Sequence, residues 1–465
     1  MQYSPVLLVV FCSAFLLSAA SFALALQSLF YPLPIDFADG LPYFINATTM
    51  YKSFSTQPYL LTYYPPLYYV VFNAFSFIRV NNAPFFYERL LELIAELASA
   101  FLVYLILKKG MHSSAFVSAL GAFLFFSFYP LYYAVSSNPE LFELCFSLFA
   151  VFLLLRKPRN YEYFAGLSVA VAFLFKQTAA LFFIAMLAFL IMKDKKSALK
   201  FFLAFAILLG IICLPLTYYS EGRFFFSVFI LPLVTPQYFL EIANMLVVPL
   251  LPLFFLIVFA LSEPISKETL LLYVLLFVLF LTFVDIAKWG SNATYFAPLI
   301  AVSSMLGTIR LNDLVGMQSN KRSKNAGNYP ARLLLARAFA LVLVFSLIAD
   351  VYSNPCVMNA QKESELAELR SLSYLQGNIL VEKPGYALIA GKPLVFEPSM
   401  FWVLHKKGLW NDSEILQQIK DRSFSAIVLQ HISRILLYYN DTKECINESY
   451  HLVYNSTAFE VYEPD

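Results

Sequence analysis

Long apolar runs separated by short polar connections are the feature that most constrains the fold of this chain. Most of the first 351 residues belong to runs of roughly 17 to 25 apolar residues, the length that a helix needs to cross a bilayer. In the whole chain 60% of residues are hydrophobic and 13% are charged, whereas a soluble domain has about a quarter of its residues charged. The composition therefore excludes a soluble globule and predicts a polytopic α-helical membrane protein.

About eleven of these runs are expected to be transmembrane helices. They are residues 5–30, 86–107, 113–134, 141–155, 161–177, 178–192, 198–217, 242–261, 269–285, 291–309 and 333–351. The first run lacks a basic segment before it and a small-residue cleavage site after it. We interpret it as an uncleaved first span and not as a signal peptide.

Basic residues favour one orientation of these spans, because cytoplasmic loops carry the excess of Lys and Arg. Four basic clusters fall on one side if the N-terminus is cytoplasmic; they begin at Lys108, Arg156, Lys193 and Arg310. The clusters are not a nucleic-acid-binding face, because apolar runs separate them. We expect an integral protein, of the plasma membrane, whose N-terminus is cytoplasmic and whose C-terminus is extracytoplasmic.

This orientation requires residues 65–80 not to cross the membrane, although they are apolar. The segment is only about 16 residues long, which is short for a span, and it opens with Pro65 and Pro66. We expect an interfacial or re-entrant helix within a first outer loop, residues 31–85. A full span here would instead move the clusters at Lys108 and Arg156 outside.

The composition changes after the last predicted span, so two domains are expected: a membrane domain, residues 1–351, and an extracytoplasmic domain, residues 352–465. In the second domain residues 379–382, 393–396 and 426–430 are predicted to be strands, and residues 411–421 a helix. These elements predict a small α/β domain. Five sequons lie on the predicted outer side, at Asn46, Asn411, Asn440, Asn447 and Asn455.

Two of the five cysteines, Cys356 and Cys445, lie in the predicted outer domain. Because that compartment is oxidising, we predict a disulfide between them. The alternative is two separate thiols. The other cysteines lie in predicted spans, where a cysteine acts as a small apolar side chain.

Ionisable side chains on the predicted outer side are the candidate functional residues. A carboxylate in the first loop lies at the interface, where ionisation costs little, whereas an ammonium near the hydrocarbon edge, such as that of Lys176, needs an anion. The carboxylates are Asp36, Asp39 and Glu140, and the cations are Arg89, Lys176 and Lys288. Tyr63 and Tyr64 belong to a run of tyrosines that offers stacking faces for a sugar, or that forms an aromatic belt at the interface. The four histidines show no metal-ligand spacing.

The order of these elements resembles the GT-C superfamily, the polyprenyl-phosphate-sugar-dependent glycosyltransferases. Its members include protein O-mannosyltransferases, the aminoarabinose transferase of lipid A and rhizobial core sugar transferases. The similarity covers most of the spans and the small outer domain. It rests on Asp36-Phe-Ala-Asp39-Gly, the Tyr-Pro-Pro-Leu-Tyr-Tyr run of residues 64–69, Arg89-Leu-Leu, Asn138-Pro-Glu140 and Phe175-Lys176-Gln-Thr.

The resemblance implies a membrane enzyme that moves a sugar from a polyprenyl or dolichyl phosphate donor to a lipid, glycan or protein acceptor on the outer face. The essential acid of the family lies in the first outer loop, so Asp36 or Asp39 is expected to deprotonate the acceptor hydroxyl. Glu140 corresponds to a second family carboxylate, with Glu in place of the more usual Asp. Lys176, Arg89 and Lys288 are expected to hold the phosphate. We expect these residues to face one cavity.

Each assignment has a plainer structural alternative. One aspartate could cap a helix that begins near Leu41. Glu140 could serve only as a favourable charge at a helix N-terminus. Lys176 could extend to bulk water, and Lys288 could pair with Asp285 one turn away.

Two other classes of protein fit the same composition. A secondary transporter or lipid flippase also has many spans with buried charges, but such proteins usually show an internal repeat, which this sequence lacks. A non-catalytic protein on the same scaffold stays open. No cofactor is predicted, a divalent cation is left open, and no nucleic acid partner is expected.

Overall fold

The computed structural model describes residues 5–75, 80, 82–128, 138–234, 253–254, 256–258, 261, 266, 269–282, 293–316, 356–431 and 441–465. Two compact units emerge. The helical unit comprises Met1–Gln27, Leu90–Leu214 and Gln237–Pro355, and the α/β unit comprises Ser28–Arg89, Pro215–Pro236 and Cys356–Asp465. Each unit is described by itself below.

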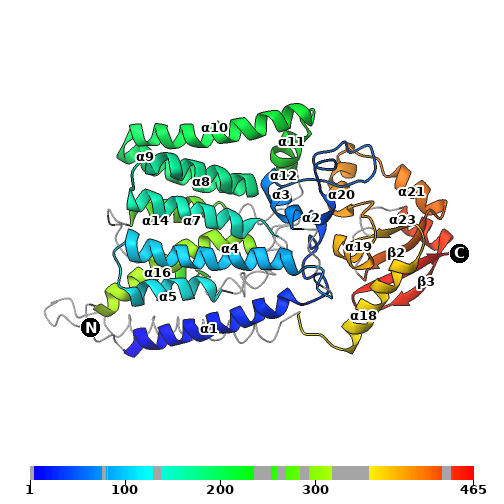
Figure 1. Ribbon diagram of the computed structural model, residues 1–465, viewed down its shortest axis with the longest axis horizontal. Helices are drawn as coiled ribbons and strands as arrows, with labels where there is room; N and C mark the ends of the chain where they lie inside the picture. The colour runs from blue at the N-terminus through cyan, green and yellow to red at the C-terminus, as the bar shows by residue number, and fades with distance from the viewer. Residues whose placement is uncertain are drawn as a thin grey trace. The chain divides into compact units, whose positions relative to one another are not determined.

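The helical unit is a bundle whose long helices run side by side (Figure 1). Their bounds are α1 (Pro5–Leu29), α4 (Phe86–Leu105), the π-helix η1 (Ile106–Gly110), α5 (Ala115–Phe126), α7 (Glu140–Arg156), α8 (Tyr161–Phe175), α9 (Ala180–Lys193), α10 (Lys195–Tyr219), α14 (Leu270–Leu279) and α16 (Ala297–Gly316). Short 3₁₀ segments, η2 (Gln177–Ala179) and η4 (Ala293–Phe296), precede α9 and α16.

Close backbone approach fixes part of this bundle. A Cβ atom on Gly166 of α8 would lie 2.3 Å from the carbonyl oxygen of Phe201 on α10. No side chain fits at that distance, so glycine is required where these two helices meet.

Among the described residues, four helices are long and apolar enough to cross a membrane: Leu7–Leu29, Phe86–Gly110, Lys195–Tyr219 and Thr294–Asp313. The other described helices of the bundle are shorter, and the predicted spans 242–261 and 333–351 lie mostly or wholly outside the described residues. The expected number of eleven spans therefore stays a prediction. The segment expected not to cross contains α3 (Pro66–Ala74), whose nine residues are too few to span a bilayer.

The α/β unit contains a four-stranded sheet in the order β1-β2-β4-β3. The parallel pair is β1 (Asn378–Val381) with β2 (Phe424–Gln430), and β4 (Phe459–Pro464) runs antiparallel to both β2 and β3 (Tyr450–Asn455). The helices of this part are α18 (Ala360–Ser371), η6 (Leu372–Tyr374), α19 (Pro384–Ala390), α20 (Pro398–Lys406), α21 (Ser413–Lys420) and α23 (Thr442–Ser449). The remaining short helices of the unit are α2 (Leu41–Phe44), α3, α11 (Arg223–Phe225), η3 (Phe226–Ile230) and α12 (Leu231–Val234).

The strand predicted at residues 393–396 was wrong, because this segment pairs with the first loop and not with the sheet. Tyr59 forms an isolated parallel bridge with Phe396. Its N–H donates to the carbonyl of Val395 over 2.8 Å, and its carbonyl accepts from the N–H of Glu397 over 2.9 Å. The hairpin of β3 and β4 was missed.

Tyr59 also explains why the compact units differ from the predicted division at residue 351. Its ring is buried against the rings of Phe396, Phe401 and Trp410, and its hydroxyl donates to the carboxylate of Glu414. Burial, followed by the Glu414 carboxylate, raises the pKa of Tyr59 above its ordinary range. The first loop therefore contributes to the hydrophobic core of the α/β unit.

The predicted disulfide is also wrong, since the structure contains Cys356 and Cys445 as separate buried thiols. Cys445 lies on α23 in the same core cluster as Ile415 and Ile419 of α21. Cys356 instead lies near the hydroxyl of Tyr31. Different surroundings thus separate the two sulfur atoms.

Candidate active site

Arg89, near the start of α4, holds the beginning of the first loop in place. Its guanidinium is fully buried. Nη1 donates to the carbonyls of Ser28 and Tyr31, and Nη2 donates to the carbonyl of Leu33 over 2.9 Å and to Oδ2 of Asp39 over 3.1 Å. The chain from Ser28 to Asp39 consequently wraps around one cation.

Asp39 is the counter-charge of Arg89 and is itself fully buried. Its Oδ2 also accepts from the N–H of Ile35 over 2.7 Å and, at 3.4 Å, from that of Asp36. The next residue, Gly40, has a φ of 86° and donates its N–H to Oε2 of Glu88 over 3.2 Å. Because a left-handed φ suits glycine, the local sequence Asp39-Gly40 favours this turn.

Two phenols, those of Tyr31 and Tyr43, lie in the surroundings of Arg89. Burial raises the pKa of Tyr31 and of Tyr43 above the ordinary range, and the Glu88 carboxylate adds to the effect on Tyr43. Both phenols therefore stay protonated. Asp39 is the anion within ion-pair distance of Arg89.

Asp36 differs from Asp39 because its side chain is only half-buried. Its Oδ1 accepts from the N–H of Ala38 over 3.1 Å, which is a local turn contact. Neither aspartate caps α2, since Gly40 is the N-cap residue and no side chain bonds to the helix end. The capping alternative for these carboxylates was therefore wrong.

Arg89 was predicted to hold phosphate, and its contacts favour a different role. Both terminal amino groups already donate to four oxygens of the segment from Ser28 to Asp39, and the side chain has no exposed surface. In this structure Arg89 positions the loop that carries Asp36.

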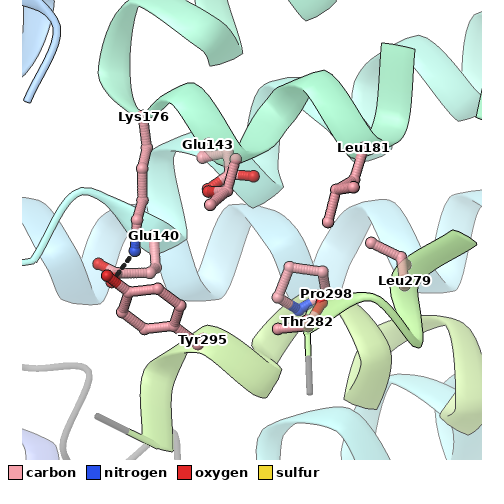
Figure 2. A pocket seen from close by; sticks show the side chains of 9 residues that line it. Glu140, Glu143, Lys176, Leu181, Leu279, Thr282, Tyr295 and Pro298 are labelled. Carbon is pink, nitrogen blue, oxygen red and sulfur yellow. Dashed lines mark hydrogen bonds and ion pairs between the residues drawn. The ribbon is translucent and has the colours of Figure 1, made fainter. Parts of the chain in front are cut away.

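A second polar cluster lies in the helical unit, where α7, α8 and η4 meet. The Lys176 ammonium forms a buried ion pair with Oε1 of Glu140. It also lies 3.4 Å from the centre of the Tyr295 ring. Figure 2 shows the ammonium beside the Glu140 carboxylate, with the Tyr295 ring close to both.

Helix ends determine the positions of the Lys176 and Glu140 side chains. Lys176 is an extended residue, with φ −151° and ψ 134°, between the end of α8 and η2. Pro139 is the N-cap residue of α7, so Glu140 is the first residue of that helix. The Lys176 ammonium and Glu140 carboxylate are therefore held at helix ends, and Lys176 does not extend to bulk water.

Glu143 lies one turn further along α7 and accepts from the hydroxyl of Thr178 over 2.6 Å. A small cavity separates these groups from α14 and α16 (Figure 2). Its volume is about 10 Å³, close to the space that one water molecule needs. It is lined by Glu140, Glu143, Lys176, Thr178, Leu181, Leu279, Thr282, Tyr295 and Pro298.

In the observed arrangement, the charges of this cluster do not favour the binding of a phosphate group. Two carboxylates, Glu140 and Glu143, accompany one ammonium, and the cavity is far smaller than a phosphate group. Oε2 of Glu140 is buried without a hydrogen-bond partner among the described residues. Lys176 could bind phosphate only after exchanging Glu140 for it.

The remaining predicted residues are placed as follows. Tyr63 and Tyr64 are half-buried, with ring centres 4.7 Å apart, whereas Tyr68 and Tyr69 are fully buried. Lys288 lies outside the described residues. In the part of the chain that the structure describes, no group of three His, Cys, Asp or Glu side chains could hold a metal ion.

Sequence reasoning missed Tyr295 and Thr178, and it also missed a line of acids on α4. Glu88, Glu92 and Glu96 are all buried and follow one another at intervals of four residues. That spacing puts them on one face of a helix, so the sequence contained a pattern that could have identified these acids. The pattern that could have identified Tyr295 was weaker: it is the polar run that precedes α16.

Comparisons with known proteins agree with this architecture. The family model described as dolichyl-phosphate-mannose-protein mannosyltransferase matches residues 64–219. The structure of ArnT from Cupriavidus metallidurans bound to undecaprenyl phosphate superposes with a TM-score of 0.62 at 15% identity, over 96% of this chain and 97% of that one. The chain has the GT-C fold.

A second GT-C structure supports the same conclusion. Archaeal oligosaccharyltransferase AglB from Archaeoglobus fulgidus, in complex with an inhibitory peptide and a dolichol-phosphate, superposes with a TM-score of 0.53 at 12% identity, over 94% of this chain and 70% of that one. In a sequence comparison no curated protein matches. The GT-C fold that the resemblance implied is confirmed, and the chain is an integral membrane protein.

The buried pair of Arg89 and Asp39 yields the first prediction. Replacing one partner leaves an uncompensated buried charge, so Arg89→Met should lower the free energy of unfolding by about 3 to 5 kcal/mol. The double variant Arg89→Met/Asp39→Leu should recover part of that loss. Thermal or denaturant unfolding in detergent measures both.

Arg370→Met is the matched control, because Arg370 lies in the same unit but is exposed and donates to the neutral Oδ1 of Asn82. It should change stability little. Equal stability of Arg89→Met and the parent would show that this ion pair does not hold the loop.

The second prediction separates two roles of Glu140. If Glu140 only neutralises Lys176, Glu140→Gln should release the ammonium and tighten binding of a polyprenyl phosphate, with turnover retained. If Glu140 is a general base, turnover should fall by about 10²-fold or more. Binding titration and initial rates on the same preparation measure the two effects, and Lys176→Met should weaken binding in either case.

Proposed function

We propose that this protein is a membrane glycosyltransferase that transfers a sugar from a polyprenyl or dolichyl phosphate donor to an acceptor hydroxyl. The observation that carries the proposal is the GT-C fold over nearly the whole chain, shared with ArnT bound to undecaprenyl phosphate. The mannosyltransferase family model supports the same class of donor. The acceptor is a lipid, a glycan or a protein.

The chemistry needs a base, because the donor already has a phosphate leaving group. The acceptor oxygen attacks the anomeric carbon, the bond from that carbon to the phosphate oxygen breaks, and the hydroxyl proton passes to a carboxylate. Asp36 suits this task better than Asp39. Its side chain is half-buried, whereas Asp39 is fully buried against Arg89.

The departing phosphate needs a cation, and Lys176 is the candidate among the described residues. Its charge is held by Glu140, so we propose that donor binding replaces that carboxylate with the phosphate. Lys288, outside the described residues, is proposed as a further cation. Tyr63 and Tyr64 are proposed to stack on the sugar, since their rings are half-buried.

A donor panel tests the proposal. Membranes that contain the protein are incubated with polyprenyl phosphates that carry different single sugars, and sugar transfer or release is followed by mass spectrometry. At least one donor should lose its sugar in membranes with the protein and not in membranes without it. Failure of every donor, in the presence of lipid, glycan and peptide acceptors, would contradict the proposal.

We also propose the orientation predicted from the basic clusters, with the N-terminus cytoplasmic and residues 352–465 extracytoplasmic. Lys196 and Gln417 are both exposed. A cysteine introduced at Lys196 should resist an impermeant thiol reagent in intact cells, and one at Gln417 should react. The reverse pattern would overturn the orientation.

A further inference from the structure

A polar hollow lies in the α/β unit, and none of its described lining residues is assigned to transfer. It is bounded by α18, by the residue after β2, and by the end of β3 with the turn that follows. Its volume is about 690 Å³, and it is lined by Gln361, Ser364, His431, Tyr454, Asn455, Ser456 and Thr457. That volume lies within the range of small-ligand sites.

Hydrogen bonds hold several of these side chains in place. The Gln361 amide donates to the hydroxyl of Thr457 and to Oε1 of Glu365. The hydroxyls of Ser364 and Tyr454 lie 3.3 Å apart. The N–H of His431 donates to the carbonyl of Ala458 over 3.2 Å, which joins the end of β2 to the turn. The lining is therefore built from three elements that are tied together.

The chemistry of the lining selects the class of ligand. Its described lining residues include no Asp, Glu, Lys or Arg, so among them no carboxylate, ammonium or guanidinium is available to pair with an ammonium or a phosphate group. Amides and hydroxyls both donate and accept hydrogen bonds, and the rings of Tyr454 and His431 offer apolar faces beside them. Neutral polyhydroxyl compounds match this combination.

An extended peptide fits this region less well. It would have to add to β3, the edge strand of the sheet. The pairing of β3 with β4 is interrupted between Leu452 and Tyr454, and such an irregularity bends an edge strand and discourages further pairing. The hollow thus favours a sugar over a strand.

We propose that this hollow is a binding site for a neutral glycan, separate from the transfer site. This proposal does not depend on the assignment of the base, because neither Asp36 nor Lys176 lines the hollow. Asn455-Ser456-Thr457 is also a sequon. The test accordingly uses protein from a host that does not attach N-glycans.

Saturation-transfer NMR on the full chain in detergent tests the site, with neutral disaccharides and trisaccharides, a sugar phosphate and a neutral tripeptide as probes. At least one neutral sugar should give signals. Tyr454→Ala and Gln361→Ala should each weaken its binding by about fivefold to tenfold.

His451→Ala is the matched control, because His451 lies on the same strand but contacts Asp465 and does not line the hollow. Thermal unfolding checks that each variant is folded. If Tyr454→Ala is unstable, Gln361→Ala alone tests the site, because Gln361 is exposed on a helix. The proposal would be overturned if no neutral sugar gave signals, or if the tripeptide or the sugar phosphate bound better than the sugars. It would also be overturned if the folded variants bound the sugar as well as the parent does.

Discussion

The buried contact between Arg89 and Asp39 is the interaction on which the candidate site in the α/β unit depends. One guanidinium binds three carbonyls and a carboxylate of the segment from Ser28 to Asp39. Because both charges are removed from water, either one alone would be strongly unfavourable. The pair thus fixes the backbone of the segment that contains Asp36. Of the two aspartates, Asp36 is the more accessible.

The same reasoning about buried charge applies to the helical unit, with a different result. Lys176 pairs with Glu140 and lies over the Tyr295 ring, while Glu143 accepts from Thr178. Nothing in this arrangement leaves a positive charge ready for phosphate. Under the proposed function, a phosphorylated lipid would bind here only if it replaced Glu140 as the partner of Lys176.

The sequence predicted the membrane class, most described helices and the GT-C resemblance, because apolar length and the order of short motifs are local properties. The resemblance also pointed to Asp36, Asp39 and Glu140, and the cost of placing charge near hydrocarbon pointed to Lys176. The sequence did not reveal that Arg89 pairs with Asp39, or that Lys176 pairs with Glu140. Each pair joins residues about 36 to 50 positions apart, and no local pattern specifies such partners.

The errors have the same origin. Residues 393–396 have the composition of a strand, but their pairing partner, Tyr59, comes from the first loop. Cys356 and Cys445 were paired because they share a domain, whereas their side chains lie in different surroundings. Whether the two polar clusters face one cavity stays a prediction.

The most direct measurement compares Asp36→Asn with Asp39→Asn in single-turnover transfer from a polyprenyl phosphate sugar, together with thermal unfolding. We predict that Asp36→Asn stays as stable as the parent and binds the donor, while its transfer rate falls by about 10²-fold or more. Asp39→Asn should lose stability because Arg89 loses its counter-charge. Transfer by Asp36→Asn at the parental rate would contradict the assignment of Asp36 as the base.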